Sequence, residues 1–186
     1  MTQILPEWIR LARSKWRHRG QEKPAFAQKS NPGQESVWDY PRPPCLVPDH
    51  RRVVVRARGK VLADSSSTFR ILETAGPPTF YLPPGDVNIS NLIFTGTSST
   101  CEWKGMARYC ALAESEEKGG EPVAWVYLHP YPGFESIAGF LSFYPGRIAC
   151  YVNDERVLAQ PGGWYGGWVT SEIVGPYKGL PGTEWW

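Results

Sequence analysis

The chain has 186 residues, of which 41% are hydrophobic and 20% charged, with a formal net charge of +2. These values fit one globular domain with extensions, and they exclude wholesale disorder and a surface basic enough for general nucleic-acid binding. The 19 glycines and 18 prolines predict short strands and many turns rather than a helical bundle. No apolar run reaches the roughly 18–20 residues of a membrane span, and the first residues lack a secretory signal, so we expect a cytoplasmic protein.

Residues 1–52 are expected to form an extension, in which a basic helix is followed by a proline-rich arm. Apolar residues recur at helical spacing over 5–18 with arginines opposite them, which predicts a short amphipathic helix ending near Gly20. Either its Trp8 and Trp16 pack on the protein's own body, or the helix docks on a membrane surface or a partner.

The arm contains VWDYPRPP at 37–44, where residues that precede proline favour extended backbone. We therefore predict that the arm crosses the body and buries Trp38 and Tyr40. A polyproline ligand for another domain is the alternative interpretation of this segment.

Residues 53–158 are predicted to form an antiparallel all-β body, because short strand-like segments follow one another without a long helix between them. The first two segments flank Ala57-Arg58-Gly59-Lys60 and predict a β-hairpin with glycine in its turn. One helical turn capped by Asp86 is predicted over 86–92, and a hairpin loop over 114–120. The predicted strands cover 53–55, 61–62, 69–73, 79–82, 106–113, 123–128, 140–144 and 147–152.

Residues 159–186 form a tail rich in glycine, proline and tryptophan, with low helix and strand propensity. Aromatic side chains are unfavourable in water, so we predict that the tail packs on the body and buries Trp164 and Trp168.

The four cysteines form no C-x-x-C pair, and the three histidines, at positions 18, 50 and 129, share no close spacing. A zinc site built from C-x-x-C pairs is therefore not expected, nor is another metal or a cofactor. We expect free thiols in a reducing compartment.

Four segments together carry a resemblance to a known family: ESVWDYPRPP (35–44), FYLPPGDV (80–87), TCEWKGMARYC (100–110) read with VAWVYLHP (123–130), and IAGFLSFY (137–144). The chain resembles the domain of unknown function 427 family, sometimes labelled nucleotidyltransferase-like. The resemblance implies a mainly β, tent-like fold, in which two antiparallel sheets meet at an angle, and it implies no activity. The sequence lacks the G-x-x-x-x-G-K-[ST] motif and a carboxylate pair spaced to hold Mg²⁺–triphosphate, so we do not expect nucleotidyl transfer.

The motif segments are rich in aromatic residues. Two charged residues, Glu73 and Lys104, lie in apolar surroundings in the same part of the sequence. Trp125 and Tyr127 should point to the same face of one strand, because side chains alternate. Apolar walls with a few placed polar groups predict a pocket for a planar or cationic small molecule or a peptide end, whereas a core with a structural Glu–Lys pair is the other interpretation. The candidate ligand-binding residues are Glu73, Tyr81, Trp103, Lys104, Tyr109, Trp125, Tyr127 and Tyr144.

Two functions from other classes stay open. One is an enzyme that uses Cys101, three residues before Lys104, or the Glu73/Lys104 pair, because a neighbouring lysine can activate a thiol. The other is an interaction scaffold that presents the aromatic arm and tail to a partner protein.

Overall fold

The computed structural model describes residues 6–114 and 120–186 of the chain, and it is mainly β. Its one α-helix, α1, covers Glu7–Ser14, which is shorter than the predicted 5–18, and begins directly after Pro6. The predicted loop over 114–120 falls largely on residues outside the described part. In the described residues, no helix has both the length and the apolar composition needed to cross a membrane.

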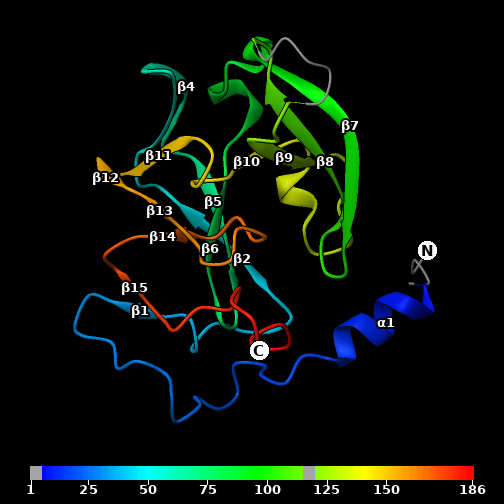
Figure 1. The fold of residues 1–186 in the computed structure, drawn as a ribbon, viewed down its shortest axis with the longest axis vertical. Helices are drawn as coiled ribbons and strands as arrows, with labels where there is room; N and C mark the ends of the chain where they lie inside the picture. Colours follow the sequence, from blue (N-terminus) through cyan, green and yellow to red (C-terminus); the bar gives the residue numbers. More distant parts are fainter. Residues whose placement is uncertain (1–5, 115–119) are drawn as a thin grey trace.

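Three sheets of three or four strands form the body, and two short strand pairs are added by the arm and the tail (Figure 1). The first sheet has the order β2-β5-β6 and consists of Cys45–Asp49, Thr68–Glu73 and Gly76–Tyr81. The second has the order β10-β9-β8-β7 and consists of Leu141–Phe143, Ala124–Tyr127, Gly105–Leu112 and Leu92–Cys101. The third has the order β12-β11-β3-β4 and consists of Glu155–Arg156, Ala149–Val152, Val53–Ala57 and Lys60–Ser65.

The outer pairs differ in the distance between their strands along the chain, because β13 and β14 are neighbours in sequence whereas β1 and β15 come from the arm and the tail. Strand β13 (Leu158–Ala159) lies antiparallel to β14 (Trp168–Val169), and β1 (Glu35–Ser36) lies parallel to β15 (Ile173–Val174). Short 3₁₀ turns cover Pro84–Asp86, Ile89–Asn91 and Glu135–Ile137.

The β3–β4 hairpin forms where its turn sequence predicts it. Arg58 and Gly59 both have positive φ, 47° and 81°, as a tight two-residue hairpin turn requires. The three consecutive valines of β3 are all buried. Local turn chemistry and burial therefore favour the same register.

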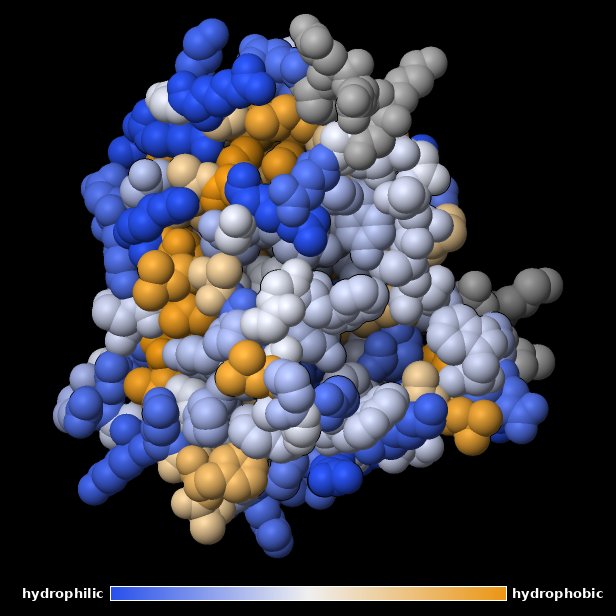
Figure 2. All heavy atoms as spheres, viewed as in Figure 1, coloured by the Kyte–Doolittle hydropathy of each residue, from blue (hydrophilic) through white to orange (hydrophobic). Residues whose placement is uncertain are grey.

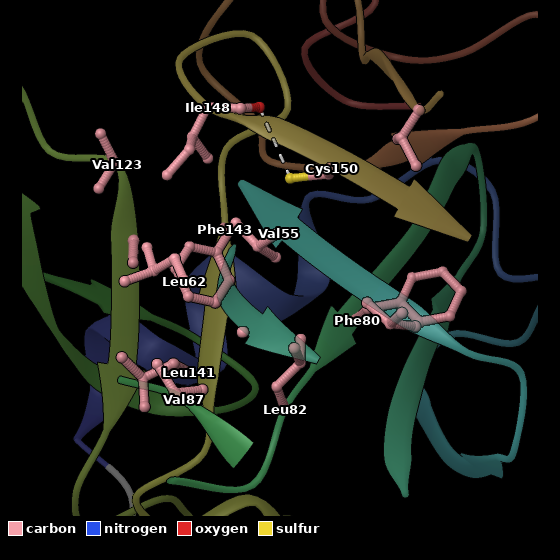
Figure 3. Packing of buried hydrophobic residues seen from close by; sticks show 14 of the residues in the cluster. Val55, Leu62, Phe80, Leu82, Val87, Val123, Leu141, Phe143, Ile148 and Cys150 are labelled. Atoms are coloured by element: carbon pink, nitrogen blue, oxygen red, sulfur yellow. Dashed lines mark hydrogen bonds between the residues drawn. The ribbon is translucent and has the colours of Figure 1, made fainter. Parts of the chain in front are cut away.

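The first and second sheets meet at Leu82 and Leu141, whose backbone groups exchange two hydrogen bonds of 2.8 and 2.9 Å. Side chains from all three larger sheets pack behind this junction (Figure 3), with Phe80, Phe143 and Cys150 among the fully buried ones. The expectation of a mainly β, tent-like fold is confirmed, because antiparallel sheets meet at an angle over a shared core.

The arm and the tail are held against each other and against the body. Glu35 N–H donates to Glu172 O at 2.7 Å, and Trp38 Nε1–H donates to Pro176 O at 3.1 Å. Trp38, Tyr40 and Trp168 are buried, as predicted.

Trp164 is a wrong prediction, because its side chain is 79% exposed. Gln160 exchanges hydrogen bonds with the backbone of Gly167, which closes the intervening segment into a loop. Gly162 and Gly163 both have positive φ, and Trp164 follows them at the tip of this loop, pointing to solvent. The tail is therefore buried at Gln160 and at Trp168, but the loop between these residues holds the indole of Trp164 outside the core.

The longest strand, β7, was not predicted. Its sequence LIFTGTSSTC contains a glycine and a run of small polar residues, which lower strand propensity. Gly96 has φ 80° within a register shift of the β7–β8 ladder, so the glycine accommodates a bulge. The strand therefore forms because it pairs with β8, although its own residues have low strand propensity.

The predicted capped turn over 86–92 is also wrong in detail. Two 3₁₀ turns replace it, and Asp86 ends the first instead of capping a helix. The Asp86 carboxylate accepts a hydrogen bond from Ser65 Oγ at 2.6 Å.

Of the two N-terminal tryptophans, only Trp16 packs on the protein itself, as one interpretation predicted. Trp16 contacts Trp185 edge-on at 5.8 Å between ring centroids, whereas Trp8 is half exposed on α1. Hydrophobic residues on the face seen in Figure 2 form small separate groups among hydrophilic ones.

Candidate functional site

A pocket of about 620 Å³ lies between the second sheet, the β5–β6 hairpin and the tail loop that carries Trp164. All eight candidate ligand-binding residues line it, and Cys101 does as well. Their role in binding stays a prediction. The wall also contains residues that the sequence did not suggest, chiefly Arg147, Gln160, Lys178 and the backbone of Gly163–Gly167.

Aromatic rings form much of the pocket wall. Trp125 and Tyr127 lie on one face of β9, and Tyr109 on β8 is the register partner of Trp125. Trp125 Nε1–H donates to the Tyr81 hydroxyl at 3.1 Å, and the ring of Trp125 lies 4.5 Å from that of Tyr144. The rings are thus fixed by contacts with one another.

Glu73 is the buried carboxylate of the pocket, and its partners come from the arm and the tail. Glu73 Oε1 lies 3.0 Å from Lys178 Nζ and 3.2 Å from Arg42 Nη2. Burial alone would raise the pKa of Glu73, but Lys178, Lys104 and Arg42 together lower it to about 2. The direct Glu73–Lys104 pair of the alternative interpretation does not form, because Glu73 is engaged by Lys178 and Arg42.

Arg42 and Lys178 were missed because no local signal marks them. Arg42 lies between prolines in the arm, and Lys178 lies 105 residues from Glu73. Arg42 also donates to the backbone oxygens of His18 and Thr74, which fixes its guanidinium. Only the folding of the arm and the tail onto β5 brings these cations to Glu73.

Lys104 is 9% exposed, and its ammonium has no hydrogen bond or ion pair to any residue in the described ranges. Burial lowers the pKa of Lys104, but its electrostatic interactions with Cys101, Tyr81, Glu73 and Glu102 outweigh burial and raise the pKa above its ordinary value. The side chain is therefore a cation that lines the pocket without a protein acceptor.

Tyr127 has the same character, because its hydroxyl forms no hydrogen bond with the residues that the structure describes, although the residue is only 4% exposed. Burial raises its pKa well above the ordinary value, so the hydroxyl stays protonated and can donate. The hydroxyl can therefore donate to water or to a ligand in the pocket.

Cys101 ends β7 at the pocket and is half-buried. Its Sγ accepts a hydrogen bond from the Trp103 backbone N–H at 3.4 Å. The neighbouring Glu102 accepts from Trp16 Nε1 at 2.7 Å, and its backbone oxygen accepts from Arg13 Nε at 2.8 Å. The N-terminal segment therefore packs on the turn that presents Cys101 and Lys104.

Arg147 lies on the pocket wall, and its charge is already paired. Its guanidinium lies 4.4 Å from the Tyr144 ring and 3.0 Å from the Glu121 carboxylate. Among residues 6–114 and 120–186, no three His, Cys, Asp or Glu side chains gather as metal ligands.

Comparison with known families now decides the assignment. The model of the family described as Domain of unknown function (DUF427), named NTP_transf_9, matches residues 45–154. The chain belongs to the DUF427 family. No curated protein matches it. The match contains all eight candidate residues but ends short of Arg42 on one side and Lys178 on the other, so the cations that hold Glu73 come from outside the DUF427 match.

Proposed function

We propose that this DUF427 protein binds a small molecule or a peptide end in the aromatic pocket. The observation that carries the proposal is a pair of donors on largely buried residues, the Lys104 ammonium and the Tyr127 hydroxyl, that line the pocket without an acceptor from the described protein. Ligand sites combine apolar and aromatic walls with a few convergent polar groups, and about 620 Å³ lies within their usual range of roughly 300–1,000 Å³.

A fragment screen on the full chain, followed by two-dimensional NMR, tests this function. We expect hits whose shift changes centre on β8, β9 and the tail loop, and whose affinity falls in Tyr127→Phe. The phenylalanine removes only a hydroxyl that has no partner, so the fold should persist. Tyr151→Phe, on β11 of the third sheet, is the matched control. Hits that bind elsewhere, or that bind Tyr127→Phe and wild type alike, contradict the proposal.

An enzyme is the second candidate, and the position of Cys101 favours it. Its thiol lines the same pocket as Lys104 and accepts a hydrogen bond from the Trp103 N–H. Lys104 would serve as a fixed cation beside the reacting centre and not as an amine nucleophile, because its raised pKa keeps it charged. Turnover of an ester or thioester fragment that is lost in Cys101→Ser supports this candidate.

An interaction scaffold is the weaker alternative, since Trp38 and Trp168 are buried within the protein itself. Four unpaired thiols suit a reducing compartment, and we propose a cytoplasmic location.

A further inference from the structure

The charges at the floor of the pocket point to the chemistry of its ligand. We infer that the ligand is a planar molecule with a carboxylate group, and that the carboxylate binds the Lys104 ammonium. The inference rests on the proposed function, because it names the ligand class of the same site.

The first step is the charge balance around the floor. Two lysines and two carboxylates line this part of the pocket, namely Lys104, Lys178, Glu73 and Glu102, and Arg42 lies against Glu73. Glu73 is engaged by Lys178 and Arg42, and Glu102 accepts from Trp16 and from the Cys101 thiol. Lys104 is therefore left without a carboxylate of its own, and a ligand with one negative charge can neutralise it.

The second step is the hydrogen bonding of Lys104. An ammonium carries three donors, and none of them meets an acceptor among the described residues. An ion largely removed from water is strongly destabilised unless an opposite charge accompanies it. A carboxylate supplies that charge and two acceptor oxygens, one of which suits the unpartnered hydroxyl of Tyr127 in the same pocket.

The aromatic residues alone would also suit a cationic ligand. The charges around Lys104 make such a ligand unfavourable. It would lie beside Lys104, and the nearest buried carboxylate, Glu73, already faces Lys178 and Arg42. Two like charges within a few ångströms repel each other more strongly in a buried site than in water. The unpartnered charge of Lys104 thus favours an anionic ligand over the cationic ligand that the sequence suggested.

The third step concerns the body of the ligand. The ring of Trp125 lies 4.5 Å from that of Tyr144 and 6.2 Å from that of Tyr81, and Tyr127 lies 6.3 Å from Tyr81. Walls built from ring faces and edges favour a flat, apolar body through stacking and edge contacts. The glycine backbone of Gly166 and Gly167 lets the tail loop approach the same space closely.

The test compares three probes that share one flat skeleton: 2-naphthoate, its neutral amide 2-naphthamide, and the cation 2-naphthylmethylammonium. Isothermal titration calorimetry on the full chain at neutral pH measures each affinity. We expect the carboxylate to bind about 10- to 100-fold more tightly than the amide, as one charge-assisted hydrogen-bonded pair allows, and the cation to bind most weakly.

Lys104→Met keeps the length of the side chain and removes its charge. We expect it to lower the naphthoate affinity to that of naphthamide while leaving naphthamide binding within about twofold, which also shows that the pocket is still folded. Lys104→Arg should retain most of the preference for the carboxylate. Lys60→Met, at the exposed start of β4, is the control for loss of one positive charge.

The outcomes separate this inference from the proposed function. Equal binding of the three probes, unchanged by Lys104→Met, overturns the anionic ligand and leaves a pocket that binds flat molecules. Tightest binding of the cation also overturns the inference. Failure of all three probes at millimolar concentration overturns it too, while the fragment screen decides separately whether the pocket binds other molecules.

Discussion

The Cα of Gly166 lies against the indole of Trp125, so closely that a Cβ at position 166 would overlap the far edge of the ring. Trp125 is buried on β9 and is hydrogen-bonded to Tyr81, so the indole cannot move aside easily. This contact fastens the tail loop to the aromatic wall of the pocket. The tail is therefore part of the site and not only an addition to the domain.

Gly166→Ala should destabilise the protein by about 1–3 kcal/mol, because the added methyl group overpacks a rigid contact. Thermal unfolding measures the effect. Gly85→Ala is the control, since a Cβ at position 85 meets nothing within 4 Å. An unchanged melting temperature for Gly166→Ala would mean that the loop does not press on Trp125 in solution.

The two tail tryptophans should differ sharply when each is changed to alanine. Trp168 is fully buried, packs on Phe80 and donates its indole N–H to Phe143 O at 2.9 Å. Its loss should cost about 3–5 kcal/mol in the free energy of unfolding. Trp164→Ala should change that free energy by less than about 0.5 kcal/mol, because the side chain is on the surface. Urea unfolding compares them, and similar losses would contradict the exposed position of Trp164.

Glu73 should make stability depend on pH in the acid range. Its pKa falls from 4.5 to about 2 on folding, so the ionised carboxylate stabilises the protein above pH 4.5, and this contribution is lost as the pH falls toward 2. The contribution is about 3 kcal/mol at neutral pH.

Glu73→Gln tests this dependence, since it leaves Arg42 and Lys178 without their carboxylate. We expect a loss of about 3–5 kcal/mol at neutral pH, shrinking as the pH falls below 4.5. Glu22→Gln, exposed in the arm, is the control. A deficit that is constant from neutral pH down to the acid transition would show that the charge of Glu73 is not responsible.

Occupation of the pocket should protect Cys101 from alkylation. Cys45 and Cys101 are half-buried, but only Cys101 lines the pocket. With 2-naphthoate bound, iodoacetamide labelling of Cys101, followed by mass spectrometry, should slow several-fold while labelling of Cys45 is unchanged. Equal rates with and without the probe would place the bound molecule away from Cys101.

Periodicity and turn chemistry determined the parts of the fold that depend on neighbours in sequence. Arg58 and Gly59 specified the β3–β4 hairpin, because both adopt the positive φ that its turn needs. The alternation of side chains put Trp125 and Tyr127 on one face of β9. The same reasoning missed β7, whose small polar residues form a strand only because β8 pairs with them.

The sequence by itself therefore determined the β-rich class, the DUF427 membership and a set of aromatic residues that the structure brings to one pocket. Only the tertiary structure decided which charges meet there. Glu73 pairs with Arg42 and Lys178 because the arm and the tail fold back over β5, and Lys104 is left without a partner as a result. Contacts between segments a hundred residues apart depend on how the chain closes on itself, and no local spacing encodes them.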